Sequence, residues 1–136
     1  MQSARKLVLL AAAILAFSAL APTATGASAK AFHLTKTCVS NVLCTVVSDT
    51  FKAIPGGTDV TYTLDPTNPA LAYPSISVRN GSTTGVCDWN QPGPVVLAKC
   101  TFGTGTGRLT QFHLAVDVSV DASNVWHWDG WYWFGG

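Results

Sequence analysis

The sequence predicts an all-β protein with about eight short antiparallel strands, arranged either as a small sandwich of the immunoglobulin-like or jelly-roll-like kind or as a small barrel. From Lys30 onward the chain contains no Met and no Glu and is rich in Thr, Val, Ser, Gly and aromatic residues, which favour strands and turns over helices. Apolar and polar residues alternate with a period of two in several segments, and turn-forming residues separate these segments.

The first half of this region contains three expected strands. β-Branched residues dominate residues 32–38 and 42–51, which we interpret as two strands joined by a short loop. Residues 54–57 (Ile-Pro-Gly-Gly) have the composition of a tight turn, and residues 60–64 alternate as a half-buried strand does. The Pro- and Asn-rich segment that follows predicts a loop from Asp65 to about Pro74.

The second half contains further strands with clearer turn signals. Alternation resumes at Ile76, and the pair Asn80-Gly81 predicts a tight hairpin whose return strand leads to Cys87. The most regular alternation lies between residues 110 and 120, and an aromatic strand follows it near the end of the chain.

Four cysteines, Cys38, Cys44, Cys87 and Cys100, predict two disulfides. Three pairings are possible, and the local spacing favours Cys38 with Cys44 and Cys87 with Cys100. The midpoint between Cys87 and Cys100 falls on Gly93-Pro94, so a hairpin turning there would place the two cysteines opposite each other.

The N-terminus has the layout of a secretory signal peptide, so we expect a protein that is secreted to the extracellular space. Arg5 and Lys6 precede an uncharged, Leu- and Ala-rich run, and Ala27 and Ala29 fit a cleavage site after Ala29. We therefore expect a signal peptide at residues 1–29 and a single domain at residues 30–136, with no transmembrane segment after the signal is removed.

The charge balance of the expected mature chain argues against a nucleic-acid partner. Residues 1–29 hold two of the eight basic residues and none of the seven acidic ones, which leaves six against seven and a net charge of −1. A nucleic-acid-binding surface usually carries a clear excess of basic residues.

The register of the last hairpin decides which aromatic residues are buried. With a three-residue loop at residues 122–124, Trp126 pairs with Val120 and Trp128 pairs with Val118, and Tyr132 and Phe134 join them in the core. The alternative register buries Asp129 without a partner, at a cost of several kcal/mol. We therefore expect Trp126, Trp128, Tyr132 and Phe134 to be core residues.

This register collects the polar and remaining aromatic residues of both strands on a second face, which we predict to bind a ligand. Its members are His113, Asp117, Ser119, His127, Asp129, Trp131 and Trp133. Trp131 and Trp133 would form an aromatic platform for sugar rings, with hydrogen-bonding groups at its rim. Asp117 would lie opposite Asp129, a repulsive placement that needs a compensating charge.

The predicted function is a binding or interaction module rather than an enzyme, with carbohydrate or another extracellular or cell-surface partner as its expected ligand and with no cofactor. Three alternatives remain open: an exported structural protein without a ligand, a glycosidase that uses Asp117 and Asp129, and a metal site built from His113, His127 and these two aspartates. The sequence leaves the oligomeric state open.

Overall fold

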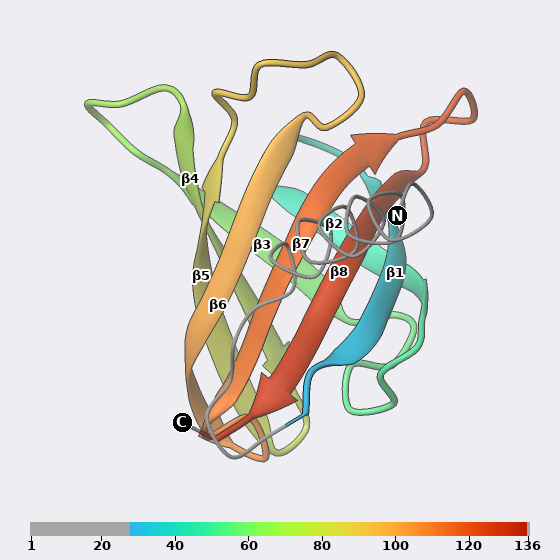
Figure 1. Ribbon diagram of the computed structural model, residues 1–136, viewed down its shortest axis with the longest axis vertical. Coiled ribbons are helices and arrows are strands. Elements are labelled where there is room, and N and C mark those ends of the chain that lie inside the picture. The colour runs from blue at the N-terminus through green and yellow to red at the C-terminus, as the bar shows by residue number, and fades with distance from the viewer. Residues whose placement is uncertain (1–27, 136) are drawn as a thin grey trace, which may run out of the picture.

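The computed structural model describes residues 28–135 and shows an all-β fold of eight antiparallel strands (Figure 1). The strands are β1 (Lys30–Cys38), β2 (Leu43–Asp49), β3 (Asp59–Leu64), β4 (Leu71–Val78), β5 (Gly81–Asp88), β6 (Ala98–Gly107), β7 (Phe112–Val120) and β8 (Trp126–Phe134).

The strands close into a barrel, so the expectation of a sandwich is wrong and the alternative of a small barrel is confirmed. Each strand pairs with the next one along the chain, and β1 pairs with β8 over seven residues, from Lys30 opposite Tyr132 to Lys36 opposite Trp126. This last pairing turns the row of strands into a closed sheet without free edges. Because sandwiches and barrels use the same alternation of side chains, the sequence pattern alone did not separate them.

The two ends of the barrel differ. At the end that carries the β2–β3 and β6–β7 connections, Ile54 and Leu109 are completely buried, and the rings of Phe51 and Phe112 stack with their centroids 5.2 Å apart. These side chains fill the interior there. The other end carries the β1–β2, β3–β4, β5–β6 and β7–β8 connections, three of which rise above the barrel at the top of Figure 1.

The register expected for the last hairpin is confirmed. Val120 pairs with Trp126 and Val118 with Trp128, and Asp117 lies opposite Asp129. Trp128 is completely buried, while Trp126 and Tyr132 are half-buried and pack against the core. Phe134 departs from the expectation, because 40% of it is exposed at the end of the barrel.

The loop expected from Asp65 to Pro74 is shorter than predicted, because β4 already begins at Leu71. Pro74 is buried inside the strand and lies opposite Tyr62 on β3. The pairing of β4 with β5 is interrupted between Ala72 and Ser75. Pro74 lies in this interruption, so its missing N–H costs no hydrogen bond of the regular pairing.

Both predicted disulfides are present, Cys38–Cys44 between β1 and β2 and Cys87–Cys100 between β5 and β6. In each pair the two cysteines are direct partners across neighbouring strands. The two disulfides are consistent with an extracellular protein.

Replacing both Cys87 and Cys100 by alanine should lower the free energy of unfolding by about 3 kcal/mol, because the disulfide closes a loop with a sequence separation of 13 in the unfolded chain. The Cys38–Cys44 pair closes a shorter loop, with a separation of 6, and its removal should cost about 2 kcal/mol. Urea unfolding of the two double variants measures both values. A larger loss for the shorter loop would show that loop entropy does not dominate.

The predicted signal peptide falls mainly on residues 1–27, which lie outside the described residues. In the described part of the chain, no helix has the length and apolar character needed to cross a membrane.

Candidate ligand-binding site

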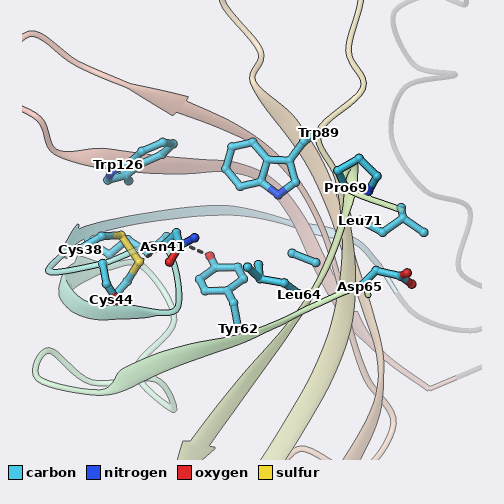
Figure 2. Close-up of a pocket in the computed structure, with 13 residues that line it drawn as sticks. Cys38, Asn41, Cys44, Tyr62, Leu64, Asp65, Pro69, Leu71, Trp89 and Trp126 are labelled. Carbon is cyan, nitrogen blue, oxygen red and sulfur yellow. Dashed lines mark hydrogen bonds between the residues drawn. A yellow bond between two sulfur atoms is a disulfide. The ribbon is translucent and has the colours of Figure 1, made fainter. Parts of the chain in front are cut away.

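A pocket of about 530 Å³ opens at the end of the barrel opposite the filled one. Side chains from β1 to β4 and residues near the ends of β5 and β8 line it, as do residues of the β1–β2 and β3–β4 loops. Figure 2 shows Trp89 and Trp126 on one side of the space, with Tyr62 and the Cys38–Cys44 disulfide on another. The volume lies within the range of pockets that hold small organic ligands.

Lys36 is a buried basic residue in the lining of this pocket. The alternation of β1 places Phe32, Leu34 and Lys36 on the inner face of the barrel, and Lys36 is only 2% exposed. Its Nζ donates a hydrogen bond to the hydroxyl of Tyr62 at 2.5 Å and contacts Sγ of Cys44 at 3.5 Å. An ammonium group has three N–H donors, so this arrangement leaves donor capacity for a further acceptor.

Aromatic rings surround the Lys36 ammonium. Nζ lies 4.8 Å from the ring centroids of Tyr62 and Trp128 and 5.9 Å from that of Trp126. The negative faces of these rings partly replace the water that the ammonium loses on burial. The three rings therefore form a cation–π environment around the Lys36 ammonium.

Burial shifts the pKa values of both Lys36 and Tyr62. It lowers the pKa of Lys36 to about 7 and raises the pKa of Tyr62 above its ordinary value. Near neutral pH, Lys36 is therefore divided between its charged and neutral forms, and Tyr62 stays a neutral phenol. The O–H of Tyr62 remains a donor while its oxygen accepts the hydrogen bond from Lys36.

The apolar wall of the pocket is formed mainly by two tryptophans. Trp89 follows directly after β5 and is 36% exposed, and Trp126 is the first residue of β8. Their rings meet edge to face, with centroids 5.9 Å apart. Such a pair presents a large, stiff apolar surface at low entropic cost.

The β3–β4 loop at the pocket rim is held in shape by Asp65. Its carboxylate accepts hydrogen bonds from the backbone N–H groups of Thr67 at 2.9 Å and Asn68 at 2.8 Å, and from the hydroxyl of Tyr73 at 2.5 Å. These bonds, led by that from Tyr73, hold the pKa of Asp65 below its usual range. These bonds therefore fix the backbone of the loop that contains Pro69, which lines the pocket together with Leu71 at the start of β4.

The residues predicted from the sequence as a ligand-binding face lie elsewhere, on the outer surface of β7 and β8. Trp131 and Trp133 are both half-buried there, and His113 stacks almost parallel on Trp133, with centroids 5.2 Å apart and an angle of 12°. Ser119 lies opposite His127 in the β7–β8 ladder.

Asp117 and Asp129 lie opposite each other, and each has a polar partner on its other neighbouring strand. Lys99 on β6 reaches Asp117 at 3.1 Å, and His33 on β1 contacts Asp129 through Nδ1. His127 is bonded through Nε2 to Asp121 at 2.7 Å. The structure thus brings His127 and Asp129 close to His33, whereas His113 and Asp117 have other partners.

The pocket and His33 were not predicted from the sequence, although the sequence contains a pattern that marks Lys36 as an inward-facing residue. Every second residue of β1 points to the same face of the strand. Lys36 is therefore on the same face as Phe32, Leu34 and Cys38, among residues that point inward. A lysine on an apolar face is unusual enough to mark a site. His33 had no such signal, since only the β1–β8 pairing places it beside Asp129.

Comparison with known proteins adds no relative from which a function could be carried over: no protein family, curated protein or solved structure matches this chain.

Proposed function

We propose that this protein binds a small amphipathic ligand in the open end of its barrel, with an acidic or carbonyl group of the ligand held by Lys36 and Tyr62 and its apolar part packed against Trp89 and Trp126. The single observation that carries the proposal is the buried ammonium of Lys36 at the inner surface of a 530 Å³ pocket. A buried charge costs several kcal/mol unless it has partners, so its presence in an apolar pocket supports a role in binding.

The chemistry of the pocket favours a medium-chain or aromatic carboxylic acid. Lys36 has N–H donors beyond the one it gives to Tyr62, and the Tyr62 O–H is a second donor beside it. Two neighbouring donors match the two acceptor oxygens of a carboxylate. The tryptophans and Leu64 and Leu71 match an apolar body. In this proposal the protein is exported by its N-terminal segment and acts as a binding module outside the cell rather than as an enzyme.

Dodecanoate and its uncharged analogue dodecanol are suitable probes for calorimetric titration. Dodecanoate should bind one molecule per chain, and Trp89→Ala should weaken its binding about 10-fold, because one of the two indole rings of the apolar wall is lost. Intrinsic tryptophan fluorescence gives a second measurement of the same binding.

Val95→Ala is the matched control for Trp89→Ala. Val95 belongs to the same β5–β6 connection and is 74% exposed, but it does not line the pocket. Its substitution should leave the affinity for dodecanoate unchanged. Failure of both probes to bind, or equal affinity in the wild type and in Trp89→Ala, would contradict the proposed site.

Carbohydrate binding on the outer face is a second candidate function, and one observation favours it. Trp131 and Trp133 lie two residues apart on the outward side of β8, are both partly accessible, and His113 holds the Trp133 ring by stacking. The accessible parts of the two indoles would provide the apolar surface on which a sugar ring could stack.

Trp131→Ala and Trp133→Ala should each abolish retention on insoluble polysaccharides such as cellulose or chitin, if this second candidate is correct. Neither change touches the pocket, so dodecanoate binding should persist in both variants. Retention that is unaffected by both substitutions would rule out the aromatic platform.

A further inference from the structure

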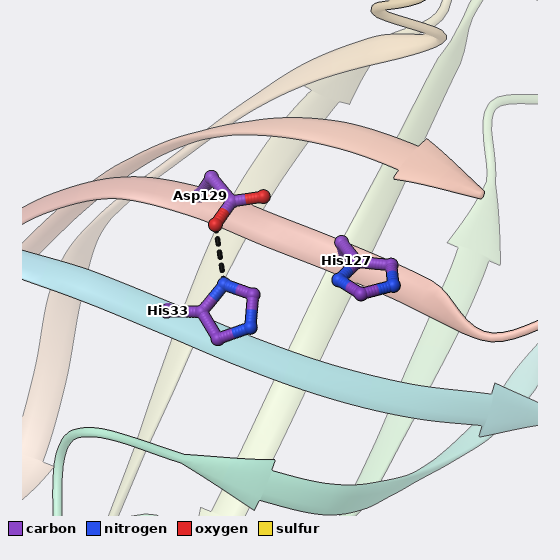
Figure 3. Close-up of side chains that lie close together, drawn as sticks. All are labelled: His33, His127 and Asp129. Atoms are coloured by element: carbon purple, nitrogen blue, oxygen red, sulfur yellow. Dashed lines mark hydrogen bonds and ion pairs between the residues drawn. The ribbon is translucent and has the colours of Figure 1, made fainter. Parts of the chain in front are cut away.

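We propose that His33, His127 and Asp129 form a binding site for a divalent transition-metal ion, zinc by preference, on the outer face of β1 and β8. This site is separate from the pocket, which lies inside the barrel. Figure 3 shows the three side chains gathered over the seam where the first and last strands meet.

The β1–β8 register brings the three residues together. His33 is the direct partner of Asp129, and His127 lies two residues before Asp129 on the same side of β8. One ligand atom from each residue can be chosen so that all three lie within 4.8 Å of one another. Ligand atoms around a zinc ion lie about 3 Å apart, given bonds of about 2 Å, so small side-chain rotations complete the site.

The orientation of His127 is set by a carboxylate outside the cluster. Its Nε2 lies 2.7 Å from Oδ2 of Asp121, which makes Nε2 the protonated nitrogen when the imidazole is neutral. Nδ1 then carries the lone pair, and in Figure 3 one ring nitrogen of His127 is turned toward His33 and Asp129. A carboxylate that fixes a histidine in this way is the usual arrangement behind metal-binding imidazoles.

Asp121 is itself held in place by the β7–β8 turn. Its Oδ1 accepts backbone N–H bonds from Ser123 at 2.8 Å and Val125 at 3.1 Å. The site therefore has both direct ligands and a supporting residue on rigid elements.

The donor set selects the class of metal. Two imidazole nitrogens and one carboxylate oxygen suit Zn²⁺ and Cu²⁺, whereas Mg²⁺ and Ca²⁺ prefer oxygen ligands alone. His33 and Asp129 are already in contact through Nδ1 and Oδ1, and a metal ion would take the place of the proton between them. Three protein ligands leave a coordination position for water or for a partner's side chain.

Calorimetric titration of untagged protein with ZnCl₂ tests the site. One Zn²⁺ should bind per chain, His33→Ala and His127→Ala should each weaken binding at least about 10-fold, and Mg²⁺ should not bind. His113→Ala is the matched control, because His113 lies on the outer face of β7 but stacks on Trp133 outside the cluster. Its affinity for Zn²⁺ should equal that of the wild type.

Asp121→Asn tests the supporting role separately. It should weaken Zn²⁺ binding about 10- to 100-fold without removing a direct ligand. Thermal unfolding gives a readout independent of heat effects: Zn²⁺ should raise the Tm of the wild type and of His113→Ala, but not that of His33→Ala. Absence of Zn²⁺ binding to the wild type, or equal weakening by His113→Ala and His33→Ala, would overturn the proposal.

Discussion

Replacing Lys36 by methionine should raise the free energy of unfolding by about 1–3 kcal/mol at pH 6, an unusual result for a change inside a core. Lys36 is 2% exposed, and its burial lowers its pKa to about 7, so the fold bears the cost of a desolvated charge at this pH. Methionine keeps the apolar stem and removes the charge, and such replacements are often stabilising. The lost hydrogen bond to Tyr62 offsets part of the gain. Guanidinium unfolding measures the difference.

The pH dependence of this difference follows from the direction of the pKa shift. Between about pH 7 and pH 10.5 the unfolded wild type binds more protons at Lys36 than the folded state does, so wild-type stability rises with pH across this window. Lys36→Met lacks this contribution, so its advantage should shrink as the pH increases from 7 to 10. An advantage that stays constant over this range would show that Lys36 is not desolvated in the fold.

The same substitution separates the stability of the barrel from its proposed binding function. Lys36→Met should weaken dodecanoate binding about 10- to 100-fold, because a charge-assisted hydrogen bond is lost, and should leave dodecanol binding within a few-fold of the wild type. A bound carboxylate favours the charged form of Lys36, so dodecanoate affinity of the wild type should fall as the pH rises above 7. Equal loss for both probes would place the acidic group of the ligand elsewhere.

Trp128→Ala should lower the free energy of unfolding by about 3–5 kcal/mol, the largest loss expected from any tryptophan of the C-terminal strand. Trp128 is completely buried, packs on Phe102 at 5.5 Å and covers the Lys36 ammonium. Its substitution leaves a cavity in the middle of the barrel that the closed sheet cannot collapse. Urea unfolding monitored by circular dichroism measures the loss.

Two further variants distinguish lost packing from a general sensitivity of β8. Trp128→Phe should cost less than about 2 kcal/mol, because the buried Nε1 of Trp128 has no hydrogen-bond partner within residues 28–135 and its removal breaks no bond. Trp131→Ala changes a residue on the outer face of β8, three residues after Trp128, and should cost less than about 1.5 kcal/mol. A loss for Trp131→Ala equal to that for Trp128→Ala would contradict the division of this strand into an inner and an outer face.

The sequence alone determined the local pairing in this protein. The symmetric spacing of Cys87 and Cys100 predicted their hairpin, and the cost of burying Asp129 selected the observed register of the last two strands. Both inferences concern neighbours in sequence, for which the length of the connection and the alternation of side chains leave few choices.

Only the tertiary structure decided which distant strands meet. The pairing of β1 with β8 joins the two ends of the described chain, closes the barrel, places His33 beside Asp129, and puts Lys36 beside Trp126. Alternation specifies which face of a strand is buried, but it does not specify the neighbour of an edge strand, because any strand with one apolar face satisfies the same pattern. The pocket depends on this closure too, since its lining includes Lys36 of β1 and Trp126 of β8, which only the β1–β8 pairing brings together.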